Sequence, residues 1–365
     1  LNREAARIRW NQMVVPGIVR HVRRRDRGDY FVLSTPPAGS AATKRIAFRS
    51  RFIHMAVGYP GVRFLDDLQA YRKEHNDFQR VVNAYEPHDH VYAEMRRRPC
   101  TVLVRGAGIV ASRVLQRLID DRDQHGAQTT IVHLFRNYPA GPQGDKATFR
   151  RPAAKGWAYQ GFNFPKAAWG GQIRDHLESL EGDARRDFID AIGGTNTAPR
   201  KHWREQLDRG EAQGFYLQGR GEVQSVIPIP DTRQIRTVVG GTTGLPTTEY
   251  DADFIIDATG LEANIEDHRV VMDLLRHVGA GKNVKGRLDV ERDFRVRNAD
   301  NGEGRIFASG SMTLGGYYAG VDSFLGLQYA ALRIHDNLVD AGFGQRIGPG
   351  RSTSQWWKWA RNTGI

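Results

Sequence analysis

The chain has 365 residues and a formal net charge of +12, from 53 Lys and Arg against 41 Asp and Glu. Its length predicts two or three domains, and 40% hydrophobic with 26% charged residues is typical of a globular protein rather than a disordered one. No apolar run approaches the roughly 20 residues of a transmembrane helix, and the first residues of the sequence do not have the pattern of a signal peptide. We therefore expect a cytoplasmic protein without a membrane partner. The single Cys100 excludes a disulfide scaffold, a CxxC redox centre and a cysteine-rich zinc site.

The positive charge comes almost entirely from arginine, because only nine of the 53 basic residues are lysine. Apart from short clusters at 23–25 and 96–98, these arginines are scattered along the chain. Nucleic-acid binding needs basic residues gathered on one face, so this distribution favours a coding bias over a nucleic-acid partner. A few of the arginines are better explained as ligands of cofactor phosphates.

The chain opens Leu1-Asn2-Arg3, without an initiator Met, and residues 3–13 have the pattern of a helix already under way. We therefore expect a fragment or a trimmed chain.

A weak internal repeat organises the sequence. Each copy has three β-rich runs, the last of which becomes apolar and stops at a glycine, Gly58 in the first copy and Gly260 in the second. The runs are Val14–Val22, Tyr30–Ser34 and Arg45–Val57, then 222–229, 234–239 and 249–260. A strand that ends in a bare glycine allows a ligand to approach the backbone, although a tight turn explains either site taken alone.

Between the two copies the pattern predicts a βαβ unit, with strands at 101–104 and 129–134 around a helix at 109–121 that Gly126 ends. Residues 140–216 interrupt the pattern with Pro/Gly-rich aromatic loops and two polar helices, near 171–192 and 198–209. Later elements are a helix at 266–278, a strand at 305–310 and a helix from Ser323 to Ala341. The tail, residues 351–365, contains Trp356, Trp357 and Trp359, and we expect it to be a docking segment.

The Gly turn of the βαβ unit matches G-x-G-x-x-A at Gly106, Gly108 and Ala111. In a dinucleotide site the first glycine makes the tight turn, the second lets the pyrophosphate approach, and the small third residue packs the helix on the strand. The next strand ends in Arg136 instead of the acidic residue that would bind the ribose of NAD. An arginine suits the 2′-phosphate of NADPH, so we expect NADPH rather than NADH, with Arg113 as a second candidate and a plain surface arginine as the alternative.

A second constellation runs from Gly310 to Ala331, where a Gly-dense loop leads into a helix capped by Ser323. The start of a helix attracts anionic ligand atoms, and Phe324 and Leu325 are too apolar for an exposed cap. We therefore expect this helix start to be buried against something flat, with ordinary packing on a sheet as the alternative.

In their order along the chain, AVGYP, RGAGIVASRVLQRL, DFIIDATG and RIFASG…DSFLGLQYAA resemble the flavoproteins with two dinucleotide-binding domains. Among these the chain is most similar to the N-hydroxylating and related class B flavin monooxygenases, over roughly residues 14–135 and 220–341. The resemblance implies FAD and NADPH as cofactors. The residues it assigns to cofactor binding are Gly58, Gly106, Gly108, Ala111, Gly260, Gly310, Ser311, Asp322, Ser323, Phe324 and Leu325, beside Arg113 and Arg136.

The chain departs from that family in two places. Ser311 stands where the family has an Asp that contacts the flavin ribityl chain or pyrophosphate. The family's first G-x-G-x-x-G, which binds the ADP part of FAD, has no counterpart in the chain, and its place would lie before Leu1. We expect truncation; the alternatives are a partner chain that supplies this half, or no bound FAD.

Other chemistries find little support. A lone cysteine cannot run a dithiol cycle, no metal-ligand spacing is present, and His88 with His90 is better explained as a polar linker. Catalytic residues stay unknown, because a flavin itself supplies the bond-making chemistry.

Within the insertion, aromatic and polar residues in a Gly/Pro-rich loop are typical of a substrate lid and equally of a packed loop. The candidates are Asn163, Lys166, Trp169 and Gln172.

The sequence thus predicts an α/β protein with two Rossmann-like, three-layer dinucleotide-binding domains: a discontinuous FAD-type domain and a nested NAD(P)-type domain, with a helical insertion. The expected segments are 1–90 (FAD-type), 91–139 (NAD(P)-type), 140–216 (insertion), 217–265 (NAD(P)-type return), 266–345 (FAD-type) and 346–365 (tail). We expect a monooxygenase acting on a small molecule, with N-hydroxylation as one reaction and with a homo-oligomer left open. The alternatives are an NAD(P)H-dependent flavin reductase or dehydrogenase, or a non-catalytic nucleotide-binding subunit.

Overall fold

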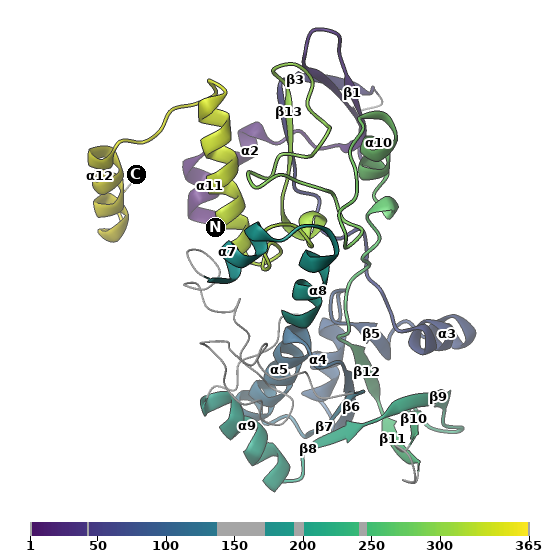
Figure 1. Cartoon of the computed structure of the whole chain (residues 1–365). Helices are drawn as coiled ribbons and strands as arrows, with labels where there is room; N and C mark the ends of the chain where they lie inside the picture. Colours follow the sequence, from purple (N-terminus) through teal and green to yellow (C-terminus); the bar gives the residue numbers. More distant parts are fainter. Residues whose placement is uncertain (1, 42–43, 137–171, 193–200, 241–246, 364–365) are drawn as a thin grey trace. The chain divides into compact units, whose positions relative to one another are not determined.

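The computed structural model describes residues 2–41, 44–136, 172–192, 201–240 and 247–363 (Figure 1). Contacts divide the chain into two units: unit 1 comprises Leu1–Gly58 and Asn264–Ile365, and unit 2 comprises Tyr59–Ala263. Unit 2 is therefore inserted into unit 1. No helix among the described residues is long and apolar enough to cross a membrane.

Unit 2 is built on a five-stranded parallel sheet in the order β5-β12-β6-β7-β8. The predicted βαβ unit is present, and both ends of each of its two strands lie within one residue of the predicted positions. The strands are β5 (Val81–Asn83), β6 (Cys100–Arg105), β7 (Thr129–Phe135), β8 (Tyr216–Arg220) and β12 (Phe254–Asp257). The helices are α3 (Asp66–His75), α4 (Asp89–Met95), α5 (Ile109–His125), α7 (Gln172–Ser179), α8 (Gly182–Ile192) and α9 (Lys201–Ala212).

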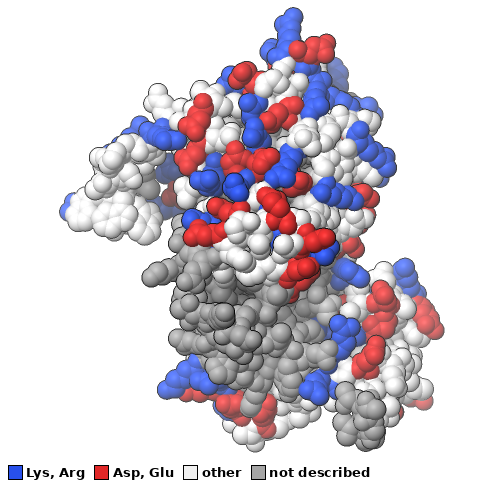
Figure 2. Space-filling view, viewed as in Figure 1, with Lys and Arg blue, Asp and Glu red and all other residues white. Residues whose placement is uncertain are grey.

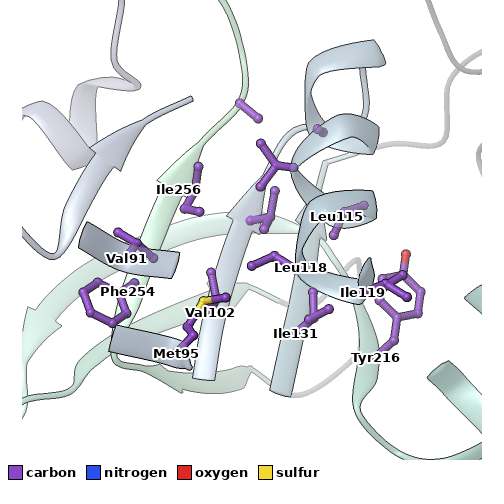
Figure 3. Close-up of a cluster of buried hydrophobic side chains, with 14 of the residues drawn as sticks. Val91, Met95, Val102, Leu115, Leu118, Ile119, Ile131, Tyr216, Phe254 and Ile256 are labelled. Carbon is purple, nitrogen blue, oxygen red and sulfur yellow. The ribbon is translucent and has the colours of Figure 1, made fainter. Parts of the chain in front are cut away.

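The sheet of unit 2 is covered on both faces, so its strands are mostly apolar. On one face α4 and α5 bury a core between themselves and the strands, as Figure 3 shows for Val91, Leu118 and Ile131. Trp203 and Leu207 of α9 belong to the same core. On the other face, side chains of α3 and of a three-stranded meander form a second core. Unit 2 is consequently a mixed α/β unit with three layers.

The internal repeat of the sequence is confirmed by the strand pairing. In unit 2 the antiparallel meander β9 (Glu222–Pro228), β10 (Ile235–Gly240) and β11 (Thr248–Ala252) is followed, after Asp253, by the parallel strand β12. In unit 1 the meander β1 (Ile18–Arg24), β2 (Tyr30–Thr35) and β3 (Ile46–Ser50) is followed, after Arg51, by β4 (Phe52–Met55). The two runs predicted as single strands, Arg45–Val57 and 249–260, are thus each divided into two strands in two different sheets.

In unit 1, β4 pairs in parallel with β13 (Arg305–Ala308), and in the described residues this sheet has two strands. Its core joins the meander and this pair to α10 (Arg269–His277) and to the loop that precedes β13. The helix predicted over 266–278 consists of a short 3-10 turn, η2 (Ile265–Asp267), and α10. The helix predicted from Ser323 is α11 (Phe324–Asp340), and a second 3-10 turn, η3 (Gly310–Thr313), precedes it.

Three helices of unit 1 have no buried residue: α1 (Asn2–Arg7), α2 (Trp10–Met13) and α12 (Pro349–Ala360). The helix α12 covers most of the tail that the sequence predicts to be a docking segment, for which no helix was predicted.

Two further expectations need correction. The helix predicted over 171–192 is divided into α7, which ends at Ser179, and α8, which begins at Gly182. Gly182 has a positive φ of 51°, which a continuous right-handed helix does not allow. The domain boundary predicted at residue 90 lies at Gly58, because β5 pairs with β12 and α3 packs on the sheet of unit 2. The loop part of the insertion, residues 140–171, lies outside the described residues.

Candidate functional site

The Gly turn lies between β6 and α5, at the carboxyl edge of the parallel sheet of unit 2, as predicted. Gly106 has a φ of +127°, and a Cβ at this position would lie 2.7 Å from the carbonyl oxygen of Ala258. Only glycine therefore lets β6 turn beside the end of β12. Gly108 occupies the N-cap position of α5, and fully buried Ala111 packs the first turn of α5 against the sheet.

The carbonyl of Gly106 is held by a buried histidine that no motif in the sequence marked. Nε2 of His133, on β7, donates to the Gly106 oxygen at 2.7 Å, and Nδ1 accepts from the Tyr216 hydroxyl at 2.8 Å. A carbonyl can only accept, so this contact assigns the proton to Nε2. Nε2 of Gln218 donates in turn to the Tyr216 oxygen at 3.1 Å.

His133 is neutral in this position. Burial lowers the pKa of His133 to about 4, because an imidazolium at this site would lose its hydration. The chain Gln218–Tyr216–His133 thus fixes the orientation of the peptide group with which the Gly turn begins. The detectable signal in the sequence was one polar residue in an otherwise apolar strand, Ile131–Phe135.

The end of β12 is fixed by a second buried polar group, Asp257. One carboxylate oxygen accepts from the backbone N–H of Thr259 at 3.0 Å and from its hydroxyl at 2.6 Å. The other oxygen accepts from the N–H of Leu65 at 2.8 Å. These hydrogen bonds fix the loop that contains Gly260. Gly260 has a φ of +155°, and a Cβ added there would meet no atom within 4 Å among the described residues. The backbone at Gly260 is therefore open to a neighbour.

Both arginines predicted as cofactor ligands, Arg113 and Arg136, are exposed. Arg136 follows the last residue of β7, and Arg113 lies on the first turns of α5, where it donates to the side chain of Gln116 at 2.7 Å. A further arginine, Arg105, ends β6 immediately before the Gly turn and forms an ion pair with Asp67 of α3. The first turn of α5 has no acidic residue, so the positive end of the helix dipole is not neutralised there.

In unit 1 the strand β13 leads directly into the second predicted constellation. Gly310 has a φ of +75°, and an added Cβ would meet only Leu327, at 3.5 Å, among the described residues. Ser311 is 4% exposed, and its Oγ is buried without a hydrogen-bond partner in the described part of the chain. A buried hydroxyl without a partner is costly, so this oxygen marks a place where a polar ligand atom would be stabilised. The preceding Ser309 hydroxyl, in contrast, pairs with Nε2 of His54 at 2.8 Å.

The start of α11 is capped as predicted, because Oγ of Ser323 accepts from the N–H of Gly326 at 3.1 Å. Its burial differs from the prediction: Phe324 is 78% exposed, Asp322 is exposed and Leu325 is half-buried. The buried residue is Gly326, whose backbone packs so closely on the carbonyl of Gly320 that a Cβ would overlap it. Gly58 follows β4, and its carbonyl accepts from Nε2 of His268 at 3.2 Å.

Of the four predicted substrate-site residues, three lie outside the described residues. Asn163, Lys166 and Trp169 lie outside the described residues, and Gln172 is the first residue of α7. Burial raises the pKa of the Cys100 thiol to about 11, so this thiol is protonated at neutral pH. Within the described ranges, no group of three or more His, Cys, Asp and Glu side chains could hold a metal ion.

No protein-family model and no curated protein matches the chain. Its structure is similar to that of the ornithine hydroxylase PvdA from Pseudomonas aeruginosa, with a TM-score of 0.60 and 16% identity over 93% of this chain and 74% of that one. The cadaverine monooxygenase DfoA from Erwinia amylovora, solved with FAD, has a TM-score of 0.63 and 15% identity over 91% and 71% of the two chains. The ornithine N-hydroxylase KtzI from Kutzneria sp. 744, solved with reduced FAD, NADP+ and L-ornithine, has a TM-score of 0.59 and 16% identity over 88% and 71%. At this level of identity the similarity establishes a shared fold.

Proposed function

We propose that the chain is an FAD- and NADPH-dependent monooxygenase that N-hydroxylates a small molecule bearing a primary amine. The observation that carries the proposal is the Gly turn between β6 and α5, confined by Ala258 on one side and held by His133 on the other. The three similar structures support the reaction type, because each of those proteins is named a hydroxylase or a monooxygenase of ornithine or cadaverine. Unit 2 is then the NADPH-binding domain, and unit 1 belongs to an FAD-binding domain.

The residues of unit 2 fit a dinucleotide. The first N–H groups of α5 have no acceptor within the helix, and they lie directly after Gly108, where a pyrophosphate can approach the backbone. The hydrogen bond from His133 fixes the Gly106 carbonyl, and in the proposed site this would keep the peptide group from rotating toward the pyrophosphate. Arg136 is our candidate ligand for the 2′-phosphate of NADPH, with Arg113 as the alternative.

The residues of unit 1 fit one half of FAD. The unpartnered hydroxyl of Ser311 and the start of α11 suit the ribityl and flavin half, where Ser311 donates a hydrogen bond that an Asp could not donate when ionised. The sequence has no G-x-G-x-x-G fingerprint for the ADP half, so these residues account for only part of such a site. When bound and reduced by NADPH, the flavin would activate O₂ for oxygen transfer.

The experiment separates the proposed monooxygenase from its alternatives in two steps. First, the purified chain is titrated with FAD and with NADPH, and binding is read from the flavin absorbance and from nucleotide fluorescence. A chain that binds neither would overturn the proposal in favour of a protein without this chemistry.

Second, NADPH oxidation is followed with and without O₂ in the presence of ornithine, lysine or cadaverine, and products are weighed by mass spectrometry. The proposal predicts O₂-dependent oxidation that an amine accelerates, with a product heavier by one oxygen atom. NADPH oxidation that no amine changes, with no oxygenated product, would instead identify a flavin reductase.

A further inference from the structure

The helix α12 carries an exposed aromatic cluster that the proposed function does not use. Trp356, Trp357 and Trp359 are 57%, 49% and 59% exposed, and no residue of α12 is buried. An isolated helix of this length is marginal in water, so most of its stability has to come from a surface that covers its apolar side. Something other than the described residues is expected to cover these indoles.

The arrangement of side chains around α12 is that of an interfacial helix. With about 100° of rotation per residue, Trp356, Trp357 and Trp359 point to one side of the axis. Arg351 and Lys358 point to the opposite side. Two indole rings are neighbours, with the centroids of Trp356 and Trp357 5.8 Å apart. A helix with Trp on one face and Lys or Arg on the other is suited to lie in the plane of a membrane surface.

The charged side chains in and around α12 are all positive. Residues 341–365 contain Arg346, Arg351, Lys358 and Arg361 and no acidic residue. In Figure 2, α12 is the lobe at the left, where white side chains are bordered by blue. The Arg361 guanidinium lies over the Trp357 ring, 4.5 Å from its centroid, so a cation accompanies the aromatic cluster itself. This combination complements an anionic surface.

Side-chain contacts with the rest of unit 1 lie in the segments that precede and follow α12. On the N-terminal side, Phe343 packs against Phe52 of β4, with ring centroids 5.3 Å apart, and Gly342 and Gly344 have positive φ angles. After its C-terminus, the side chain of Asn362 and the carbonyl of Thr363 accept from the guanidinium of Arg3. The indoles are thus left available to a partner.

We propose that α12 docks the protein on the surface of a bilayer that contains anionic lipid. The Trp rings would enter the headgroup level, where their N–H groups stay hydrated, while Lys358 and Arg351 reach the lipid phosphates. With 12 residues the helix is too short to span the hydrocarbon core. A second copy of the chain is a poorer partner, because the whole chain carries +12 and two basic segments would repel each other.

This inference is independent of the proposed function, and it changes one expectation from the sequence. The absence of an apolar run long enough to cross a bilayer led us to expect no membrane partner. A helix that lies on the surface needs no such run.

The test is cosedimentation of the full chain with vesicles of phosphatidylcholine alone or of phosphatidylcholine mixed with phosphatidylglycerol. We expect about tenfold or stronger partitioning onto the anionic vesicles, weakened by salt. Replacing the three tryptophans (Trp356→Ser, Trp357→Ser and Trp359→Ser) should abolish binding to both. Replacing the cations (Arg351→Gln, Lys358→Gln and Arg361→Gln) should remove the preference for anionic lipid. As a control, Ile227→Ser, an exposed apolar residue of β9, should bind like the unaltered chain.

Three outcomes would overturn the proposal. The unaltered chain could bind neither vesicle, or the tryptophan variant could bind as well as the unaltered chain. The third outcome is self-association of the unaltered chain without lipid, measured by sedimentation velocity and lost in the tryptophan variant. This result would show that the indoles contact a second copy of the chain instead of a membrane. Circular dichroism of each variant verifies that it is folded, which we expect because none of the replaced residues is buried.

Discussion

Acidification from pH 7 to pH 5 should destabilise unit 2, because the imidazole of His133 has to stay neutral where it is buried. Its ring has one proton, on Nε2, and the Tyr216 hydroxyl donates to Nδ1. A second proton would turn Nδ1 from an acceptor into a donor that faces another donor. The folded protein therefore resists protonation of a group that the unfolded chain protonates readily.

The size of the effect follows from the two pKa values. The ordinary pKa of 6.5 describes His133 in the unfolded chain, and burial lowers it to about 4 in the folded protein. Above pH 6.5 both states are neutral and the free energy of unfolding is unaffected. As the pH falls from 6.5 towards 4, only the unfolded chain gains the proton, and the free energy of unfolding decreases. At pH 5 the loss is about 2 kcal/mol, or roughly 4–8 °C in Tm for a unit of about 200 residues.

The assay is thermal unfolding followed by circular dichroism at pH 7 and pH 5, for the unaltered chain and for His133→Gln. Glutamine keeps an N–H donor for the Gly106 carbonyl and cannot be protonated. The variant should be less stable at pH 7 but should lose less stability on acidification, by about 2 kcal/mol. The exposed His202 provides a matched control, and His202→Gln should keep the pH dependence of the unaltered chain. Equal pH dependence in His133→Gln and the unaltered chain would refute the assignment.

Three further predictions concern the proposed cofactor sites. Gly106→Ala should lower the Tm and weaken NADPH binding, because the new Cβ would overlap the Ala258 carbonyl at a backbone angle that disfavours alanine; unchanged NADPH titration would contradict this. Arg136→Ala should raise KM for NADPH about tenfold or more, as expected for a lost charge-assisted hydrogen bond, and leave KM for NADH nearly unchanged; equal effects on both would show that Arg136 does not bind the 2′-phosphate. Ser311→Ala should leave the Tm equal or higher, because it removes a buried hydroxyl without a partner in the described residues, while weakening FAD binding; a variant with unaltered FAD affinity would remove Ser311 from the site.

The strand, the turn and the start of the helix could be predicted to within a residue because their signals are local, although α5 ends at His125, four residues later than predicted. An apolar strand, two glycines and a helical apolar stripe determine β6, the turn and α5 within 26 consecutive residues. The same holds for Ser323, whose side chain caps the helix that follows it. The division of 171–192 into two helices also has a local signal, Gly182, but a glycine inside a helical pattern does not by itself end a helix.

What the sequence could not show depends on contacts between distant residues. His133 and Tyr216 are 83 positions apart, and only the parallel pairing of β7 with β8 brings them together. The placement of α3 and β5 in unit 2 likewise depends on the pairing of β5 with β12. Phe324 is exposed because α11 packs on the loop at Gly320 through another side, that of Gly326. The apolar residues of α11 lie on several sides of the helix, so the sequence alone does not determine which side is buried.

The way unit 2 is inserted into unit 1 has a consequence for the order of folding. The two segments of unit 1 are separated by about 200 residues, and closing an unstructured loop of that length costs about 5 kcal/mol in chain entropy. The entry and exit of unit 2 lie side by side: Glu262 N–H donates to the Gly61 carbonyl at 2.9 Å, and Val62 forms a bridge with Leu261. Once unit 2 has folded, the loop that unit 1 has to close shrinks to a few residues. Unit 2 is therefore expected to fold first and to act as the template that brings the two halves of unit 1 together.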